Sequence, residues 1–597
     1  MARTRWTAAG LALGAALLAA QAADVTTVRI TDQVLVPDTI RLGINTCGDN
    51  YWDSSIVKTR VAENFEGVRY RMITWGPEQD GNGLATWFSP PREAFEAMKG
   101  TVKYRILGGP GKGTTGLIRD FGTRKIKDGR ELTYIVLDKK VPASQGNKNG
   151  LLLELERLDQ GCIGETSNPA FWNAEQNTAC IGDIPPGSFG QAALWLKGSE
   201  ESAHYTFVPI WANQIEPNGT WRVQFWAKAK AGEPTLRLSL RSANIPAIQP
   251  DAQWRKQDLH IEVKGWPEKE NSIAMRFEAT GGDVLLDDIV IWKEEQDRNP
   301  TPFRDTLVDV LKRLRPGILR HLQMGGSDLE TNLRPRLQQV AWSRDFRNLL
   351  KGARNKAQRY DFNLHDYYLL CEHVGADPWY CLPGTLHPEE IPGLMEYLGG
   401  GLNIVNDALL MMREKKIRSQ CLFNLNQKQF YEGIKLWGFC PGLSRTDQRY
   451  RPVFLATQIA NKVIGGGLVA TEHSGAKPTF SATGLFEDTR KKGEATTYES
   501  IPTLWSHAFR KGARRGLLLV NLDTARAHPV AVTFSGSVKD RAATAWWLTA
   551  EDIGANNEYE TGQPQVVIRE DRLTDFASGK AVSLPPFSMV ALQWSAE

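Results

Sequence analysis

The chain has 597 residues, of which 23% are charged and 41% are hydrophobic, and its formal net charge is +4. This length predicts roughly two to four domains, and a charge so near neutrality gives no electrostatic reason to expect nucleic acid or an anionic membrane as a partner. At the start, two arginines precede an apolar run over 8–20, and Ala20-Gln21-Ala22 fits a cleavage site. We therefore interpret 1–22 as a signal peptide and expect a secreted or periplasmic protein. No later run is apolar enough to span a membrane.

Residues 23–83 are predicted to open a barrel domain, with its first strand at Ile40–Asn45. Over 84–295 the pattern changes to short alternating strands with turn signals, which is typical of a sandwich or jelly roll. Apolar residues alternate over 221–225 and again over 236–240, and a turn sequence at 231–234 between them predicts a hairpin. Because the helix and strand pattern resumes only near Thr301, we expect this jelly roll to be inserted into the barrel domain.

Residues 296–475 repeat a helix, a strand and a loop, which is the pattern of a (β/α) barrel. Apolar residues over 303–314 fall at helical spacing, with Thr301 as the expected cap and Pro302 as the first helical residue. A strand over 318–322 and a glycine-opened loop follow. A second helix is expected to end at Gly375, and a buried strand comes next at 378–382.

The last part of the chain, 476–597, is again rich in alternating strands, and we expect a terminal β-sandwich. The predicted fold class is therefore a multidomain α/β and β protein. It has a (β/α)8 TIM-barrel-like domain, complete or incomplete, with an inserted β jelly roll and a C-terminal β-sandwich.

Several stretches together resemble a known family. They are LHDYYLLCEHVGADPWYCLPG, QCLFNL, KLWG, RPVFLATQIAN and LPPFSMVAL, in this order along the chain. In this order they are similar to the α-L-arabinofuranosidase-like glycoside hydrolases, family 51 and its relatives. The inserted segment, with FWAKAKAGEPTLRLSLRS and VLLDDIVIW, resembles the jelly-roll carbohydrate-binding modules attached to such enzymes.

The resemblance implies a retaining glycosidase, in which one glutamate is the acid/base after the fourth strand and another is the nucleophile after the seventh. The sequence departs from this pattern, because the predicted strand that contains QCLFNL begins at Ser419, only 36 residues after Pro383. Since each strand–helix repeat takes about 30 residues, the middle strands do not fit there. The remaining Asn-Glu pair, Asn557-Glu558, is interpreted as an exposed turn. Glu389 and Glu390 are interpreted as acids in a first helical turn, which leaves Glu472 as a weak catalytic candidate.

The resemblance also implies substrate-binding residues, for which the candidates are Asn45, Arg320, Ser327, Asp328 and Trp437. Asp287 and Asp288 are candidates for a structural calcium ion, with plain loop acids as the alternative. No other cofactor is expected. Two functions stay open: hydrolysis of polysaccharide, with arabinofuranosyl linkages as the first choice, and non-catalytic binding of carbohydrate by a homologue that lacks the catalytic glutamates. The expected partner is a polysaccharide or oligosaccharide in both cases.

Overall fold

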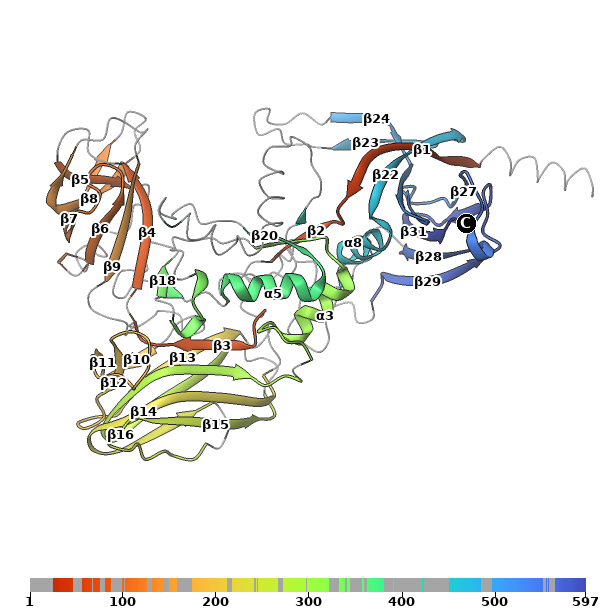
Figure 1. Ribbon diagram of the computed structural model, residues 1–597. Coiled ribbons are helices and arrows are strands. Elements are labelled where there is room, and N and C mark those ends of the chain that lie inside the picture. Colours follow the sequence, from red (N-terminus) through yellow and green to blue (C-terminus); the bar gives the residue numbers. More distant parts are fainter. Residues whose placement is uncertain are drawn as a thin grey trace, which may run out of the picture.

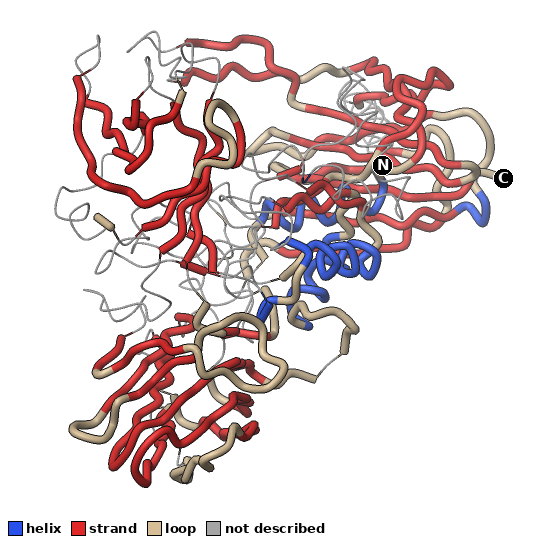
Figure 2. The backbone as a smooth tube through the Cα atoms, turned by 60° about the vertical axis from the view of Figure 1, so that its left-hand side comes forward, coloured by secondary structure: helices blue, strands red, loops and turns tan. Residues whose placement is uncertain are grey.

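A computed structural model of the chain describes residues 25–46, 56–66, 68–75, 81–86, 99–100, 102–125, 131–142, 150–157, 174–211, 217–240, 243, 245–266, 272–296, 298–321, 332–338, 341–343, 357–358, 362–380, 390, 421–422, 450–484, 496–550, 555, 557 and 564–597. Three large β-sheets surround a small parallel sheet and its helices (Figures 1 and 2). None of the described helices is long and apolar enough to cross a bilayer.

The centre of the fold is a parallel sheet with the strand order β20-β17-β2-β21. The strand bounds are Asp377–Tyr380 for β20, Ile318–His321 for β17, Gly43–Thr46 for β2 and Cys421–Leu422 for β21. The strand that comes last in sequence pairs with the first, as the last strand of a closed barrel does. Since a (β/α)8 barrel has eight strands, the described strands make a half-barrel, and the barrel prediction is met in part.

Three helices pack against one face of this half-barrel: α3 (Asp305–Leu314), α5 (Leu364–Val374) and α8 (Pro452–Val463). Their apolar faces form one core with the buried strand residues Ile44 and Leu319. The α5 helix ends at Gly375 in the left-handed conformation, as predicted, and it begins with a capping box on Asn363 that the sequence analysis did not identify. Burying this face against the strands supplies the main stabilisation of such short helices.

The start of α3 differs from the prediction. The helix begins at Asp305 with Arg304 as the N-cap residue, so Thr301 is not the cap and Pro302 is not the first helical residue. The Thr301 hydroxyl bonds instead to the Asn299 side chain, and it accepts a 3.3 Å hydrogen bond from the backbone N–H of Phe303. These bonds form a turn ahead of the helix, and Glu295 Oε2 accepts from the N–H of Asp305 at 2.9 Å.

A second sheet lies below the helices in Figure 1 and contains the long antiparallel pair β14 and β16. The hairpin predicted within 221–240 is wrong, because β14 runs unbroken from Gly219 to Ser239 and pairs with β16 along this length. Register shifts absorb the extra residues of the expected turn. The strands of this sheet are β3 (Thr59–Glu63), β10 (Ala174–Gln176), β11 (Thr178–Ile181), β12 (Ala193–Leu196), β13 (Ala203–Trp211), β14 (Gly219–Ser239), β15 (Arg255–Val263) and β16 (Ser272–Lys293).

A third sheet forms separately from the second, although most of its strands, like those of the second sheet, lie between β2 and α3 in the chain; β18 and β19 come after α3. Its strand order is β19-β18-β4-β5-β8-β7-β6-β9. The domain boundaries at 83 and 295 stay predictions, and the sheets show two β modules where one was expected. The bounds are β4 (Val68–Trp75), β5 (Gly81–Thr86), β6 (Val102–Gly108), β7 (Thr115–Lys125), β8 (Glu131–Val141), β9 (Gly150–Arg157), β18 (Ala341–Ser343) and β19 (Ala357–Gln358).

The C-terminal part forms a nine-stranded sheet around its own apolar core. The first described strand, β1 (Thr26–Thr39), lies inside this sheet, antiparallel to β22 and parallel to β27. The N-terminal segment is thus part of the C-terminal module. The other strands are β22 (Gly466–Gly475), β25 (Leu504–Lys511), β26 (Arg514–Asn521), β27 (His528–Thr533), β28 (Ala542–Thr549), β29 (Val567–Thr574), β30 (Ala581–Leu584) and β31 (Ser588–Ser595), while β23 (Thr479–Gly484) and β24 (Thr496–Pro502) form a separate pair.

Candidate functional site

Three side chains form a row on the half-barrel. In the parallel register, Arg320 pairs with Asn45 on one side and with Trp379 on the other. Paired residues of neighbouring strands point to the same face of a sheet. The preceding residues Ile44 and Leu319 point to the helices, where they are fully buried. Asn45, Arg320 and Trp379 therefore lie on the opposite face, which is the inner face of the half-barrel, and we call them the inner-face row.

Two atoms of this row are buried polar groups that lack a partner in the described part of the chain. Asn45 is only 3% exposed. Within the described residues, neither Asn45 Oδ1 nor Arg320 Nε has a hydrogen-bond partner. Buried polar atoms in native proteins are nearly always satisfied, and an exception needs an explanation such as a bound ligand or water. The row is thus suited to accept a hydrogen bond at Asn45 and to donate one at Arg320.

The third member of the row adds a flat aromatic surface. Trp379 is 42% exposed, and the Arg320 guanidinium lies 5.2 Å from the centroid of its ring. This cation–π contact fixes the guanidinium plane beside the indole. An exposed aromatic face next to hydrogen-bonding groups is the arrangement that binds a ring with an apolar C–H face and hydroxyl edges.

The helix-facing side of the same strands holds the row in place. The buried Tyr367 hydroxyl of α5 bonds to the carbonyl of Leu319 and accepts a 3.1 Å hydrogen bond from the N–H of Trp379. Burial raises the pKa of Tyr367 well above its ordinary value, so the phenol stays protonated and keeps its donor. His321 packs against Tyr367 and Tyr380 with ring centroids 5.5 and 5.6 Å apart. One tyrosine thus fixes both β17 and β20 at the level of the inner-face row.

The structure brings two of the predicted substrate-binding residues together, since Asn45 and Arg320 are register partners. Ser327, Asp328 and Trp437 lie outside the described residues. The sequence analysis missed Trp379, because it predicted a buried strand at 378–382, whereas no residue of β20 is buried and Trp379 is 42% exposed. The substrate-binding role of the row stays a prediction.

The weak catalytic candidate Glu472 lies in another sheet. It belongs to β22 of the C-terminal module, where its carboxylate pairs with Arg29 of β1 at 3.1 Å. Both side chains are more than half exposed, and such surface pairs contribute little to stability. A catalytic role for Glu472 stays a prediction.

The structure changes the interpretation of two other positions, Asn557 and Glu390. Asn557 is 2% exposed rather than in an exposed turn, and its amide bonds to the backbone of Tyr450 and Val566. Glu390 is interpreted from the sequence as an acid in a first helical turn, but its carboxylate also forms an ion pair with the buried Arg71 of β4, at 2.7 Å from the guanidinium. Glu390 therefore connects the chain after β20 to the third sheet.

The calcium candidates lie in β16 of the second sheet. Asp287 is fully buried, and one of its oxygens accepts from the N–H of Asp288 at 2.8 Å. Asp288 accepts a hydrogen bond of 2.5 Å from the Ser188 hydroxyl. Burial, and after it the neighbouring Asp288, raises the pKa of Asp287 to about 8. Among the described residues no set of three or more ligating side chains could hold a metal ion, so the calcium site stays a prediction.

Comparison with solved structures gives information on the fold. No protein-family model matches the sequence, and no curated protein matches it. The arabinose-bound MgGH51 α-L-arabinofuranosidase superposes with a TM-score of 0.51 at 11% identity, over 96% of this chain and 100% of that chain. The arabinofuranosidase of Thermotoga maritima reaches a TM-score of 0.35 at 13% identity, over 50% of this chain and 92% of the other. The protein therefore has a fold like that of the GH51 α-L-arabinofuranosidases.

Proposed function

We propose that this protein is a secreted, glycoside-hydrolase-like protein that recognises polysaccharide, with arabinofuranosyl units as the sugar bound. The observation that carries the proposal is the inner-face row, in which a buried amide oxygen, a guanidinium and an exposed indole stand side by side. In barrel folds, binding groups gather at the ends of the strands and on the loops that follow them. The MgGH51 enzyme whose fold this chain shares is described as arabinose-bound.

The chemistry of the row matches a neutral sugar. The carbonyl oxygen of Asn45 can accept from a sugar hydroxyl, and the Arg320 guanidinium can donate to a ring or hydroxyl oxygen. The Trp379 ring offers a flat face to the C–H groups of the sugar. A buried polar group that gains its partner only from the ligand discriminates strongly against ligands without the matching hydroxyl.

A second site for carbohydrate is proposed on the second sheet, which the sequence likens to a carbohydrate-binding module. Two ammonium groups lie over the partly buried Trp195 ring, that of Lys197 at 4.8 Å and that of Lys230 at 4.7 Å from its centroid. Its indole N–H donates to Asp283 at 3.0 Å, which fixes the ring plane. A fixed aromatic ring flanked by donors supports binding of a polysaccharide chain to this module.

Hydrolysis is the second candidate function, and the fold likeness to an arabinofuranosidase over 96% of the chain favours it. A retaining mechanism needs two carboxyl groups about 5–5.5 Å apart across the scissile bond. None of the three residues of the inner-face row carries a carboxylate. We place recognition first because the inner-face row supplies groups that bind a sugar, and hydrolysis second.

One experiment separates the two functions. The full chain is assayed for release of sugar from aryl arabinofuranosides, arabinan and arabinoxylan, and for retention on gels that contain the same polysaccharides. We expect retention without turnover. Turnover would place the protein among the hydrolases, and Glu472→Gln would then test the weak catalytic candidate. If the chain shows no retention and no turnover on any of these substrates, the proposal is contradicted.

A further inference from the structure

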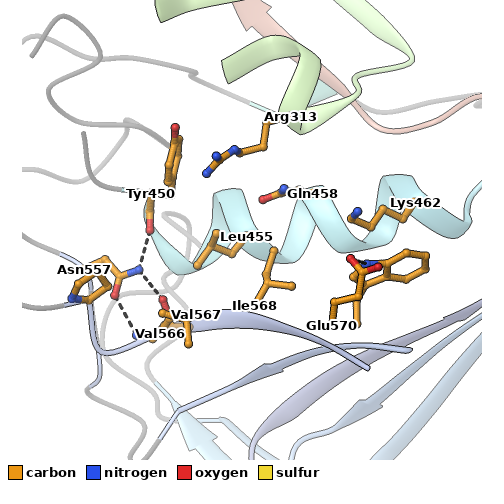
Figure 3. Close-up of a pocket in the computed structure, with 12 residues that line it drawn as sticks. Arg313, Tyr450, Leu455, Gln458, Lys462, Asn557, Val566, Val567, Ile568 and Glu570 are labelled. Carbon is orange, nitrogen blue, oxygen red and sulfur yellow. Dashed lines mark hydrogen bonds between the residues drawn. The ribbon is translucent and has the colours of Figure 1, made fainter. Parts of the chain in front are cut away.

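A pocket of about 350 Å³ lies between helices α3 and α8 and strands β28 and β29, and it shares no residue with the inner-face row (Figure 3). Its volume is within the range of about 300–1,000 Å³ typical of small-molecule sites. Leu455, Gln458 and Lys462 reach it from one face of α8, because they are three and four residues apart. The other lining residues are Arg313, Tyr450, Trp546, Asn557, Pro564, Val566, Val567, Ile568 and Glu570.

Two aromatic rings of the pocket are held in place, and a cationic side chain lies over each of them. The Arg313 guanidinium lies 4.9 Å from the centroid of Tyr450, whose ring is stacked on Phe454 at 4.7 Å. The Lys462 ammonium lies 4.6 Å from the centroid of Trp546. The Trp546 indole N–H donates to Glu570 at 2.7 Å. The two cations therefore stay at the pocket in defined positions rather than extending freely into solvent.

The charge of the pocket is unbalanced. Within the described residues neither Arg313 nor Lys462 forms an ion pair, and the carboxylate of the lining, Glu570, is bonded to Trp546. Burial lowers the pKa of Lys462; Glu570 opposes this shift, while Arg315 adds to it. A bound anion would favour the charged ammonium. Two cations against one carboxylate leave the pocket with an excess positive charge.

The remaining lining is rigid and partly apolar. Asn557 Nδ2 donates to the carbonyls of Tyr450 and Val566 at 2.8 and 2.7 Å, and its Oδ1 accepts from the N–H of Val566 at 2.9 Å. These bonds join the start of α8 to the segment ahead of β29. Val567 is 56% exposed beside this wall, and Figure 3 shows Ile568 pointing into the same space from β29. The pocket thus offers an apolar surface at one side and cations at the other.

We infer that this pocket binds an acidic sugar, with the carboxylate of a uronic acid residue between Arg313 and Lys462 and its ring against Val567 and Ile568. Gln458 of α8 lies between Arg313 and Lys462 in Figure 3, and its amide can form a hydrogen bond with a sugar hydroxyl. This site is additional to the proposed function, because it uses neither Asn45 nor Arg320. It would allow the protein to hold an acidic side group or backbone residue of a polysaccharide while the half-barrel holds a neutral one.

The test is a calorimetric titration of the full chain at low salt with methyl glucuronoside and galacturonate. Methyl glucoside serves as the neutral probe and acetate as an anion without a ring. We expect saturable binding of the two uronates alone, weakened as salt screens the cations. Arg313→Gln should lower the affinity at least about fivefold, roughly 1 kcal/mol. Lys462→Met, which keeps a hydrocarbon chain over Trp546, should do the same. Arg572→Gln, an exposed β29 residue outside the pocket, should change nothing.

Other outcomes would overturn the inference. Uronate affinity that is unchanged in both pocket variants would place the site elsewhere. Equal affinity for acetate or for methyl glucoside would mean that the pocket does not recognise an acidic sugar. Asn45→Ala should leave uronate binding intact, so the failure of this site and the failure of the proposed function at the half-barrel are measured separately.

Discussion

Asn45 of β2 and Arg320 of β17 are partners in a parallel register, and each has a buried polar atom that finds no partner among the described residues. A protein that only needed to fold would gain from an apolar pair at these positions, because buried polar atoms without partners cost free energy. We therefore propose that these two residues serve a bound ligand rather than the fold. The predictions below test this pair and the contacts that support it.

Arg320→Lys should weaken sugar binding about fivefold, because an ammonium group cannot reproduce the planar guanidinium that lies against Trp379. The measurement is a titration with an arabino-oligosaccharide. Arg298→Lys is the matched control, since the Arg298 side chain is 54% exposed and pairs with Asp309 at the surface. Full affinity in Arg320→Lys would show that the guanidinium plane has no part in recognition.

Arg71→Met should destabilise the third sheet strongly. Arg71 is 6% exposed and is shared by Glu154 at 2.8 Å and Glu390 at 2.7 Å. Removing one partner from a buried ion pair costs about 3–5 kcal/mol. Because Glu154 keeps Arg105 at 2.6 Å, we expect the lower end, about 3 kcal/mol, by chemical denaturation. Arg255→Met, at an exposed pair with Asp251, should cost less than about 1 kcal/mol. Similar losses in both variants would contradict this account.

Asp287→Asn should remove a loss of folding stability that the wild type shows as the pH rises through about 8. Asp287 releases its proton near pH 4 in an unfolded chain, but its pKa is raised to about 8 in the fold, by burial first and then by Asp288, Glu66 and Glu63. The folded protein therefore binds an extra proton between these pH values. Binding of this proton stabilises the fold fully below about pH 4, and the stabilisation is lost as the pH rises through about 8.

The variant should match the wild type at pH 4 and exceed its stability at pH 9 by at least about 1 kcal/mol. Thermal unfolding with a chelator present, which keeps calcium out of the comparison, gives both values. Asp251→Asn, at an exposed position, should show no such gain at pH 9. If Asp287→Asn follows the wild-type pH profile, the carboxyl group is not the source of the effect.

In Asn461→Leu the half-barrel should unfold at a markedly lower concentration of denaturant than in the wild type. The fully buried Asn461 of α8 accepts from the N–H of Leu42 at 2.9 Å and donates to the carbonyls of Leu42 and Leu314. These bonds join α8 to the segment before β2 and to the end of α3. Leucine would leave buried backbone groups unpaired, and we expect a loss of about 2–4 kcal/mol. Val453→Ala, at an exposed position of the same helix, should change stability by about 0.5 kcal/mol or less.

Local signals allowed much of the half-barrel to be predicted. The apolar spacing ahead of β17 and the glycine after α5 predicted two helices and the strands that follow them, because these features act within a few residues of the chain. Asn45 and Arg320 were named as candidates from the resemblance, and the register brings them together.

Pairings between distant segments could not be predicted in the same way. Val28 of β1 pairs with His473 of β22 and with Val532 of β27, and the alternation of β1 is equally compatible with any sheet. The turn residues near Gly232 predicted a hairpin, but pairing with β16 along the whole of β14 overrode this local preference. The contact between Glu390 and Arg71 also depends on tertiary structure alone.

The most direct test of the central claim is a titration of an arabino-oligosaccharide into the wild type and into Asn45→Ala. Because Asn45 Oδ1 has no partner among the described residues, the variant should lose about 1 kcal/mol of stability or less, while its affinity falls at least about tenfold. Glu472→Gln, at an exposed ion pair in another sheet, should bind as the wild type does. Unchanged affinity in folded Asn45→Ala would contradict the claim that the inner face of the half-barrel recognises the sugar.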